Sequence, residues 1–187
     1  MPDFPAYPTL ARLLGTSPQF SASFTDLSNF PHIEAVAASR RARLLGQAGE
    51  HIVDSILLRH GLFCAPMPEG APSDRLMPLS NRSFRLQIKT RTRPDPRGYV
   101  FKMQKGYRFS PAGCRSYAAG DYDIAALVAL PINTVMFSAA QSATILMPTE
   151  QIPQFRAHPL ASLDQAVREL IAREAELAAL PAYRAAA

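Results

Sequence analysis

Cysteine is scarce in this sequence and long apolar runs are missing. The two cysteines, Cys64 and Cys114, make neither a disulfide framework nor a metal cluster, which favours a reducing cytoplasm. No stretch approaches the ~20 consecutive apolar residues of a membrane span, so we expect no membrane partner. The first ten residues hold three prolines and no basic, apolar signal segment, so secretion is not expected either.

Common catalytic motifs are also missing. The four histidines show no metal-ligand spacing, and the sequence contains no phosphate-binding loop, no Gly-x-Gly-x-x-Gly and no nucleophile elbow. A histidine-based metal centre, a P-loop nucleotide hydrolase and a dinucleotide-binding enzyme are therefore disfavoured.

Acidic residues are scarce in one part of the chain, which we call the basic segment (82–115). It holds ten Lys or Arg residues and one acid, Asp95, and arginine outnumbers lysine seven to three. The formal net charge of the whole chain is +5. A basic run is as often a solvated surface as a binding surface. Guanidinium groups fit phosphate and aromatic rings stack on bases, so the arginines and the interleaved rings favour a nucleic-acid partner. These rings are Tyr99, Phe101, Tyr107 and Phe109.

The apolar pattern predicts two helical regions. Residues 1–32 are expected to form an N-terminal extension, with one short helical candidate at 9–14. A helix is expected over 33–60, ending at a Gly61 cap. A second helix is expected to start at Ser162, with Gln165 completing a capping box. We predict that the C-terminal helical segment, 151–187, packs on a core formed by 33–150.

Strands are expected between the helices, at 62–65, 74–79, 83–91, 99–103, 107–109, 123–130, 134–138 and 144–147. Ser80-Asn81 predicts a hairpin turn, and Lys105-Gly106 predicts a second one that pairs 99–103 with 107–109. The run 123–130 is almost entirely apolar, as in a strand buried on both faces. Together these elements predict an α/β fold with a central mixed β-sheet flanked by helices.

The strand at 83–91 presents two chemically different faces. Strand alternation places Phe84, Leu86 and Ile88 on one face, which suits a core. Arg85, Gln87, Lys89 and Arg91 share the other, where an amide and an ammonium group point the same way. Such a face is often just the solvent side of an amphipathic strand. Asp74 begins the preceding strand, however, so the hairpin is expected to bring its carboxylate beside Gln87. A lone aspartate at this place also suits a turn.

Two glycines interrupt the first helix in Gly46-Gln47-Ala48-Gly49-Glu50. Each costs roughly 1 kcal/mol relative to alanine in a helix interior, so a close approach to the sheet is expected. Helical spacing places Glu50 at the border of the buried face. Its alternative role is a boundary carboxylate that pairs with an arginine such as Arg43.

Three motifs in this order resemble the PD-(D/E)xK nuclease superfamily. They are the Gly-x-x-Gly-Glu helix, Pro72-Ser73-Asp74 at a strand start, and Gln87-Ile88-Lys89-Thr90 on the next strand. That superfamily includes restriction endonucleases, Holliday-junction resolvases and a group of intron-homing endonucleases. The resemblance covers roughly residues 44–130. It implies a restriction-endonuclease-like fold, with 33–150 as the nuclease-like core. It also implies a magnesium-dependent endonuclease acting on duplex or branched DNA, with Mn²⁺ as a substitute for Mg²⁺.

The resemblance implies a role for each matching residue. Asp74, the Gln87 amide and the main-chain carbonyl of Ile88 would bind the metal, Glu50 would act through a metal-bound water, and Lys89 would orient or activate the attacking water. The catalytic set is thus Glu50, Asp74, Gln87 and Lys89, with Asp123 on the rim of the site. From the basic segment, the expected nucleic-acid contacts are Arg85, Arg91, Arg93, Lys102, Lys105 and Arg108.

The sequence departs from the superfamily pattern at two positions. Arg75 stands where an apolar residue is usual, which leaves a shifted strand start open. Gln87 stands where Glu or Asp is usual, which removes one negative charge. A nucleic-acid-binding protein that retains the fold without efficient catalysis is therefore the main alternative. An RNA-processing or interaction subunit is a third. Nucleases that cut both strands often act as dimers, so a homodimer also stays open.

Overall fold

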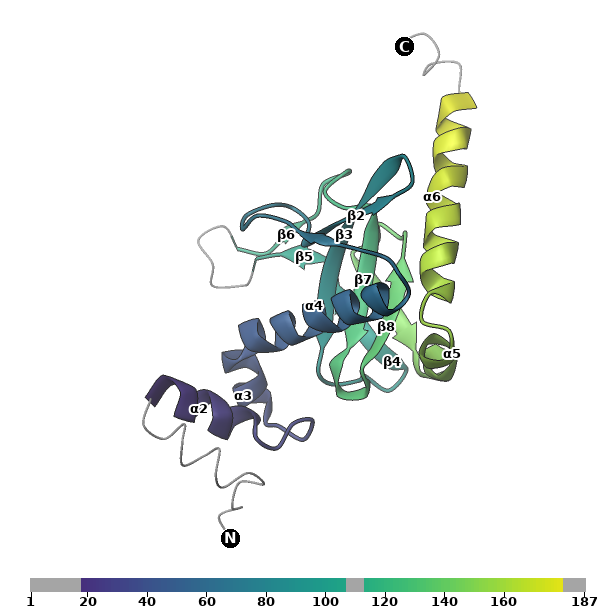
Figure 1. Ribbon diagram of the computed structural model, residues 1–187. Coiled ribbons are helices and arrows are strands. Elements are labelled where there is room, and N and C mark those ends of the chain that lie inside the picture. Colours follow the sequence, from purple (N-terminus) through teal and green to yellow (C-terminus); the bar gives the residue numbers. More distant parts are fainter. Residues whose placement is uncertain (1–17, 107–112, 180–187) are drawn as a thin grey trace. The chain divides into compact units, whose positions relative to one another are not determined.

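The computed structural model describes residues 18–106 and 113–179 (Figure 1). The chain divides into two units, with the boundary between Ala48 and Gly49 inside helix α4 (Ala42–Arg59). The first unit contains α2 (Pro18–Leu27), α3 (Ala35–Arg40) and the start of α4. Asp26 accepts hydrogen bonds from the guanidinium groups of Arg40 and Arg41, at 3.1 and 2.8 Å. The single helix predicted over 33–60 is therefore wrong, because the chain turns at Arg41 between α3 and α4.

A five-stranded mixed sheet forms the centre of the second unit. Its strand order is β1-β2-β3-β7-β8, where only the β3–β7 pair is parallel. The strands are β1 (Ala65–Pro66), β2 (Arg75–Leu79), β3 (Arg82–Arg91), β7 (Ile124–Ala129) and β8 (Thr134–Ser138). The β2–β3 hairpin turns at Ser80, whose φ of 56° is left-handed, and β7 is buried along its whole length. Both features were predicted. The first strand begins at Ala65 instead of at residue 62.

Two smaller antiparallel pairs accompany this sheet. β4 (Gly98–Lys102) pairs with β9 (Thr144–Pro148), and β5 (Gln104–Lys105) pairs with β6 (Arg115–Ser116). Among the described residues, the partner of β4 is a strand more than forty residues later, and this pairing was not predicted. Residues 107–109, the expected partner strand, lie outside the described residues.

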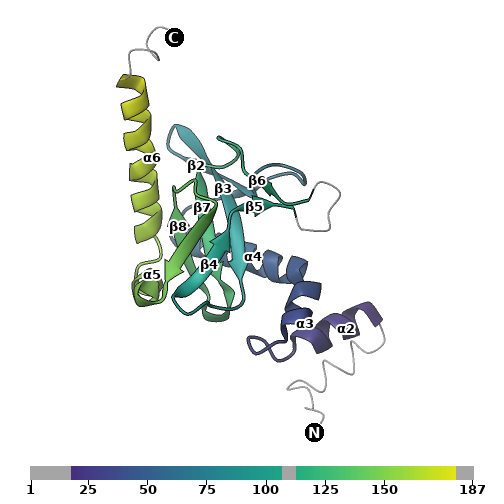
Figure 2. The same cartoon turned by 180° about the vertical axis from the view of Figure 1, so that it is seen from behind.

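Helices cover one face of the central sheet. Val53, Ile56 and Leu57 of α4, with Leu163, Ala166 and Leu170 of α6 (Ala161–Ala179), pack on alternate residues of β3, β7 and β8. Tyr99, Phe101 and Met147 of the β4–β9 pair cover the opposite face, together with Phe155 of α5 (Ile152–Ala157). Figure 2, seen from behind, places β4 in front of the sheet and α4 beyond it. The unit is therefore a mixed α/β structure with a central mixed sheet flanked by helices.

The end of the chain differs in detail from the prediction. Short 3-10 turns occupy Leu130–Ile132 and Thr149–Gln151, and α5 was not predicted. Helix α6 begins at Ala161, and the capping box is wrong. The Ser162 hydroxyl accepts the main-chain N–H of Phe137, and Gln165 donates to Glu169.

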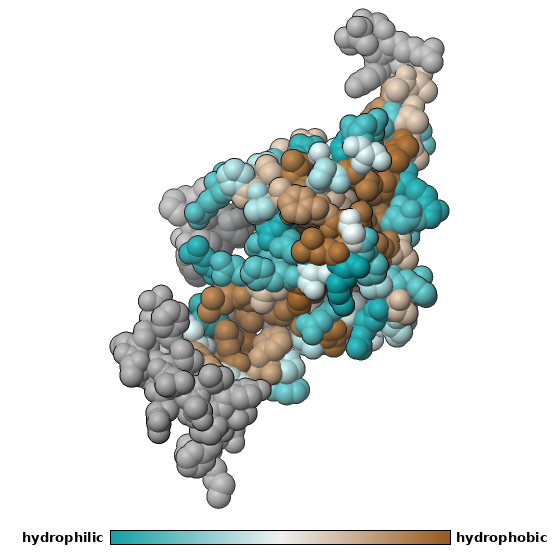
Figure 3. Space-filling view, viewed as in Figure 1, coloured by the Kyte–Doolittle hydropathy of each residue, from teal (hydrophilic) through white to brown (hydrophobic). Residues whose placement is uncertain are grey.

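On the face in Figure 3, apolar residues gather beside α6. Among the helices in the described part of the chain, none has the length and apolar content needed to cross a membrane.

Candidate active site

Asp74 lies where the loop after β1 becomes strand β2. Its main-chain N–H donates to the carbonyl of Leu86 (2.9 Å), which fixes the residue against β3. Its carboxylate oxygen Oδ2 accepts the main-chain N–H of Ile88 (2.6 Å) and the amide Nε2 of Gln87 (2.5 Å). The β2–β3 register pairs Arg75 with Leu86, so the Asp74 carboxylate falls beside Gln87. The structure thus brings together the two residues that the hairpin pattern placed together.

Gln87 and Lys89 point to the same side of β3, opposite the helix-covered face. The Gln87 side chain is only 6% exposed, and its Nε2 lies 3.3 Å from the carbonyl oxygen of Ile88. One amide group therefore contacts both the Asp74 carboxylate and the Ile88 carbonyl. The described residues contain no cluster of three or more His, Cys, Asp or Glu side chains suited to a metal. Any metal at this place would take its ligands from one carboxylate, one amide and one carbonyl.

Glu50 reaches this region through Arg75. The Arg75 guanidinium lies 3.0 Å from Glu50 and makes two contacts of 2.9 Å with Asp54, while donating to the main-chain carbonyl of Asp74. Glu50 and Asp54 are four residues apart, so they share one face of α4. The sequence-based alternative paired Glu50 with an arginine such as Arg43, whereas its ion-pair partner is Arg75. The sequence signal for this partner was the arginine at a position where an apolar residue is usual.

Gly49 allows α4 to approach the sheet closely. A Cβ at this position would overlap Oγ1 of Thr90 and lie 3.1 Å from both Cβ and Cγ2 of that residue. The close approach predicted from the glycine pair is confirmed at Gly49. It is wrong for Gly46, where a Cβ would meet nothing within 4 Å. The short contact also places Glu50, the next residue, near the start of β2.

Burial shifts the two titratable groups nearest Gln87 toward their neutral forms. Desolvation raises the pKa of Asp74, and the Glu50 carboxylate raises it further, while the Ile88 N–H and the Lys89 cation act in the opposite sense. Desolvation lowers the pKa of Lys89, against the influence of Asp74. An acid and a base shifted in this way at one place are common in functional sites, although structural ion pairs also shift pKa values.

Asp123, the predicted rim residue, is engaged with Arg85. Its Oδ2 accepts the main-chain N–H of Arg85 (2.7 Å) and the guanidinium Nε (3.1 Å), and its Oδ1 accepts Nη2 (2.8 Å). The Asp123 N–H donates to the Arg85 carbonyl (2.9 Å). These contacts join the start of β7 to β3. One predicted nucleic-acid contact and the predicted rim residue therefore bind each other.

The other basic residues fall into two groups. Arg91, Arg93 and Lys102 are exposed, and Arg91 lies 3.6 Å from Asp95. Lys105 is partly buried and forms an ion pair with Asp121 (2.5 Å). Arg108 lies outside the described residues. The exposed group is accessible to a polyanion, whereas Lys105 and Arg85 each contact a carboxylate of the segment before β7.

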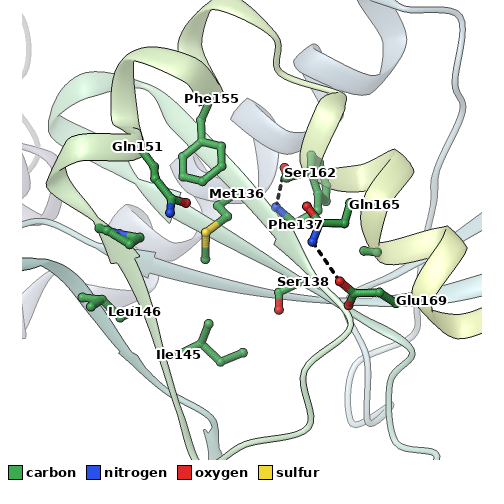
Figure 4. Close-up of a pocket in the computed structure, with 12 residues that line it drawn as sticks. Met136, Phe137, Ser138, Ile145, Leu146, Gln151, Phe155, Ser162, Gln165 and Glu169 are labelled. Atoms are coloured by element: carbon green, nitrogen blue, oxygen red, sulfur yellow. Dashed lines mark hydrogen bonds between the residues drawn. The ribbon is translucent and has the colours of Figure 1, made fainter. Parts of the chain in front are cut away.

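A separate cavity of about 310 Å³ lies between β8, β9 and the helices α5 and α6 (Figure 4). Met136, Ile145 and Phe155 provide apolar walls, and Gln165 and Glu169 bond to each other at its rim. None of the residues predicted for the active site lines this cavity.

Few known proteins resemble this chain. No family model matches the sequence, and no curated protein matches it. Among solved structures, a bacterial homing endonuclease, I-Ssp6803I, aligns with a TM-score of 0.48 and 13% sequence identity. The alignment covers 56% of this chain and 76% of that chain. A likeness of this size assigns neither a fold family nor an activity.

Proposed function

We propose that this chain is a metal-dependent endonuclease that hydrolyses phosphodiester bonds in DNA, on a restriction-endonuclease-like fold. The supporting observation is the arrangement around Gln87. The Asp74 carboxylate, just before β2, and the Ile88 carbonyl, in β3, are two oxygen acceptors that converge on its amide group, at 2.5 and 3.3 Å. Two converging acceptors make a place where a cation satisfies both oxygens at once.

The donor set fits Mg²⁺, with Mn²⁺ as a substitute, because both ions prefer oxygen ligands. Asp74 and the Ile88 carbonyl would hold the ion. Gln87 would join them through Oε1 after a half turn of its amide, whose two ends differ little in shape. Glu50 would contribute through a water. When bound, the metal would neutralise charge that develops on the phosphate oxygens during hydrolysis.

The charges around the site leave room for a cation. Glu50, Asp54 and Asp74 carry three negative charges against the two positive charges of Arg75 and Lys89, which leaves one net negative charge. Arg75 balances one of the two helix carboxylates and Lys89 lies near Asp74, so the uncompensated charge falls mainly to the Glu50 and Asp54 pair beside Asp74. This is one charge fewer than a second carboxylate at position 87 would give, so metal binding should be weak.

The chain itself supplies the proton chemistry and the DNA contacts. Lys89 orients the attacking water, and burial lowers its pKa, which makes its proton easier to release. The exposed Arg91, Arg93 and Lys102 would hold the DNA backbone, which makes binding strongly dependent on salt. Duplex and branched DNA are both compatible with contacts to phosphate alone.

The experiment is cleavage of supercoiled plasmid and branched DNA against Mg²⁺ concentration, with EDTA as the blank. Asp74→Asn keeps the side-chain volume and removes the charge, so it should lower the rate by about 10³-fold or more while leaving DNA binding intact. Gln87→Glu adds a charged ligand and should lower the Mg²⁺ concentration needed for half-maximal rate. Equal cleavage by wild type and Asp74→Asn would overturn the site assignment.

A second candidate function rests on the same amide. Gln87 donates to Asp74 in this structure, so it supplies a hydrogen-bond donor to the carboxylate without a metal. This arrangement favours a nucleic-acid-binding protein that retains the fold and does not cut. Salt-sensitive DNA binding without cleavage at any Mg²⁺ or Mn²⁺ concentration would establish this alternative in place of the enzyme.

A further inference from the structure

The Tyr117 ring lies beside the proposed active site, between two ammonium groups and a second ring. Nζ of Lys89 is 5.1 Å from the ring centroid and Nζ of Lys105 is 5.2 Å from it. The Tyr122 ring meets Tyr117 edge-on, with centroids 5.1 Å apart and an interplanar angle of 85°. A cation within about 6 Å of a ring centroid is attracted by the ring's electrons. Tyr117 therefore contacts the one lysine assigned to the chemistry.

Tyr117 begins the segment 117–123, which hydrogen bonds and an ion pair hold to neighbouring strands. Just after it, the Ala118 N–H donates to the Asp121 carboxylate (2.5 Å), and the Asp121 N–H donates back to the Ala118 carbonyl (3.1 Å). Lys105 binds the same carboxylate at 2.5 Å, which ties the segment to β5. Arg85 donates to the carbonyl of Gly120, which ties the segment to β3. The ring is thus carried by a turn that two strands hold in place.

Lys89 has a second contact from the same side of the sheet. Its Nζ donates to the main-chain carbonyl of Gln104, in β5, at 2.8 Å. A carbonyl and an aromatic face hold an ammonium group without neutralising it, since neither carries a negative charge. The group keeps its remaining donors for a water or a phosphate oxygen near Asp74.

We propose that Tyr117 is a positioning residue for Lys89: its ring, carried by the fastened 117–123 turn, fixes where the Lys89 ammonium group lies. The effect on rate rests on the proposed endonuclease function. The placement of the ammonium group is measured independently of cleavage.

Lysine-selective NMR tests the placement in the full chain. The sequence contains three lysines, Lys89, Lys102 and Lys105, so ¹³C-labelled lysine gives three resolvable CεH₂ signals, assigned by single Lys→Arg variants. Protons over a ring face are displaced upfield by its ring current. The Lys89 and Lys105 signals should lie upfield of the signal from the exposed Lys102, and nuclear Overhauser contacts should join Lys89 to the Tyr117 ring.

Variants separate the ring from other causes of displacement. Tyr117→Leu should return the Lys89 signal to the Lys102 position, whereas Tyr117→Phe, which keeps the ring, should preserve the displacement. Phe63→Leu removes an exposed ring between α4 and β1 and serves as the matched control, with all three signals unchanged. A wild-type Lys89 signal at the Lys102 position overturns the proposal even if Tyr117→Leu does not fold. So does a displacement that survives Tyr117→Leu.

Kinetics measure the consequence. A catalytic group displaced by about 1 Å can cost up to about 10²-fold in rate, so Tyr117→Leu should lower kcat by roughly tenfold with little change in KM. Tyr117→Phe should cut at nearly the wild-type rate. An unchanged kcat in Tyr117→Leu would overturn the positioning role. If wild type cuts no DNA, the proposed function fails, and the NMR signals still decide whether Tyr117 places Lys89.

Discussion

Two aspartates stand in matching places on either side of β3 and are used differently. Asp74 immediately precedes β2 and Asp123 immediately precedes β7, and each accepts a main-chain N–H of β3. Asp123 also receives the Arg85 guanidinium on both carboxylate oxygens. Among the described residues, the donors to the Asp74 carboxylate are neutral: the Ile88 N–H and the Gln87 amide.

The Asp123 carboxylate therefore stabilises the fold, whereas the Asp74 carboxylate is available to bind another partner. A fixed guanidinium neutralises Asp123 and joins two strands. Asp74 is partly buried and forms no ion pair with the described residues, and burial raises its pKa, so its charged form lowers the stability of the fold. We therefore expect substitutions on the Asp74 side to reduce the chemistry and substitutions on the Asp123 side to reduce stability.

The largest expected effect is a loss of cleavage rate on substitution of Lys89, on the Asp74 side of β3. Lys89→Ala removes the ammonium group that acts beside Asp74, so cleavage should fall by about 10²–10³-fold, a usual range for a group that handles a proton. DNA binding should fall much less, because Lys89 is partly buried and the exposed cations remain. Cleavage rates at saturating DNA and binding by fluorescence anisotropy measure the two effects.

Arg156→Ala, which truncates an exposed cation on α5, is the control for loss of one positive charge. Its rate should stay at the wild-type value. If Lys89→Ala matches this control, Lys89 has no role in the chemistry.

The approach of α4 should have the next largest effect. Gly49→Ala forces a Cβ against Oγ1, Cβ and Cγ2 of Thr90, so Thr90 or α4 must shift, and the free energy of unfolding should fall by about 1–3 kcal/mol. Glu50 would move away from Arg75 and the Asp74 side of β3. Urea unfolding measures the change.

Gly46→Ala is the matched control, since open space surrounds that position. It should be neutral or stabilise the protein by up to about 1 kcal/mol. Equal effects of the two substitutions would show that the Gly49 contact does not set the distance between α4 and the sheet.

On the other side of β3, Asp123→Asn should lower the free energy of unfolding by about 1–2 kcal/mol, because it leaves the Arg85 guanidinium with a weaker acceptor. The comparison is Glu174→Gln, which breaks the more exposed Arg82–Glu174 pair between β3 and α6. Exposed pairs contribute less, so Glu174→Gln should cost under about 1 kcal/mol. Chemical denaturation of both variants gives the values. The opposite ranking would mean that the Asp123–Arg85 contact adds little stability.

The smallest effect is on the pH dependence of stability. The pKa of Asp74 is raised in the fold, so the folded protein keeps this proton to higher pH than the unfolded chain. Its contribution to stability is therefore lost as pH rises above the ordinary value of 3.8. In EDTA, the Tm of Asp74→Asn minus that of wild type should grow from about pH 3 to about pH 7. Thermal melts measure it, and a constant or shrinking difference would mean that Asp74 is not held against its charge.

The parts of the fold that the sequence predicts depend on local patterns. The alternation of Phe84, Leu86 and Ile88 with polar residues, together with the turn at Ser80, is enough to predict the β2–β3 hairpin and its faces. The pairing of β4 with β9 joins 98–102 to 144–148, and nothing local identifies the partner. The nearby Lys105-Gly106 turn instead suggested a hairpin of 99–103 with 107–109, and residues 107–109 lie outside the described part of the chain.

In the candidate site, too, the contacts that were predicted follow from local patterns and the others follow from packing. The contact of Asp74 with Gln87 follows from the hairpin register, so the sequence was sufficient for it. The contact of Arg75 with Glu50 crosses from a strand to a helix, and that of Lys89 with Tyr117 crosses from β3 to a turn 28 residues later. Such contacts depend on how the elements pack, and periodicity carries no information about that.

Metal binding to Asp74 is the central claim, and titration of Mn²⁺ into the full chain, followed by calorimetry or by the Mn²⁺ paramagnetic resonance signal, tests it most directly. Wild type and Asp123→Asn should bind a single Mn²⁺ with similar affinity, Mg²⁺ should displace it, and Asp74→Asn should weaken binding by at least about tenfold. Mn²⁺ binding that is equal in wild type and Asp74→Asn, or that is lost in Asp123→Asn instead, would contradict the claim.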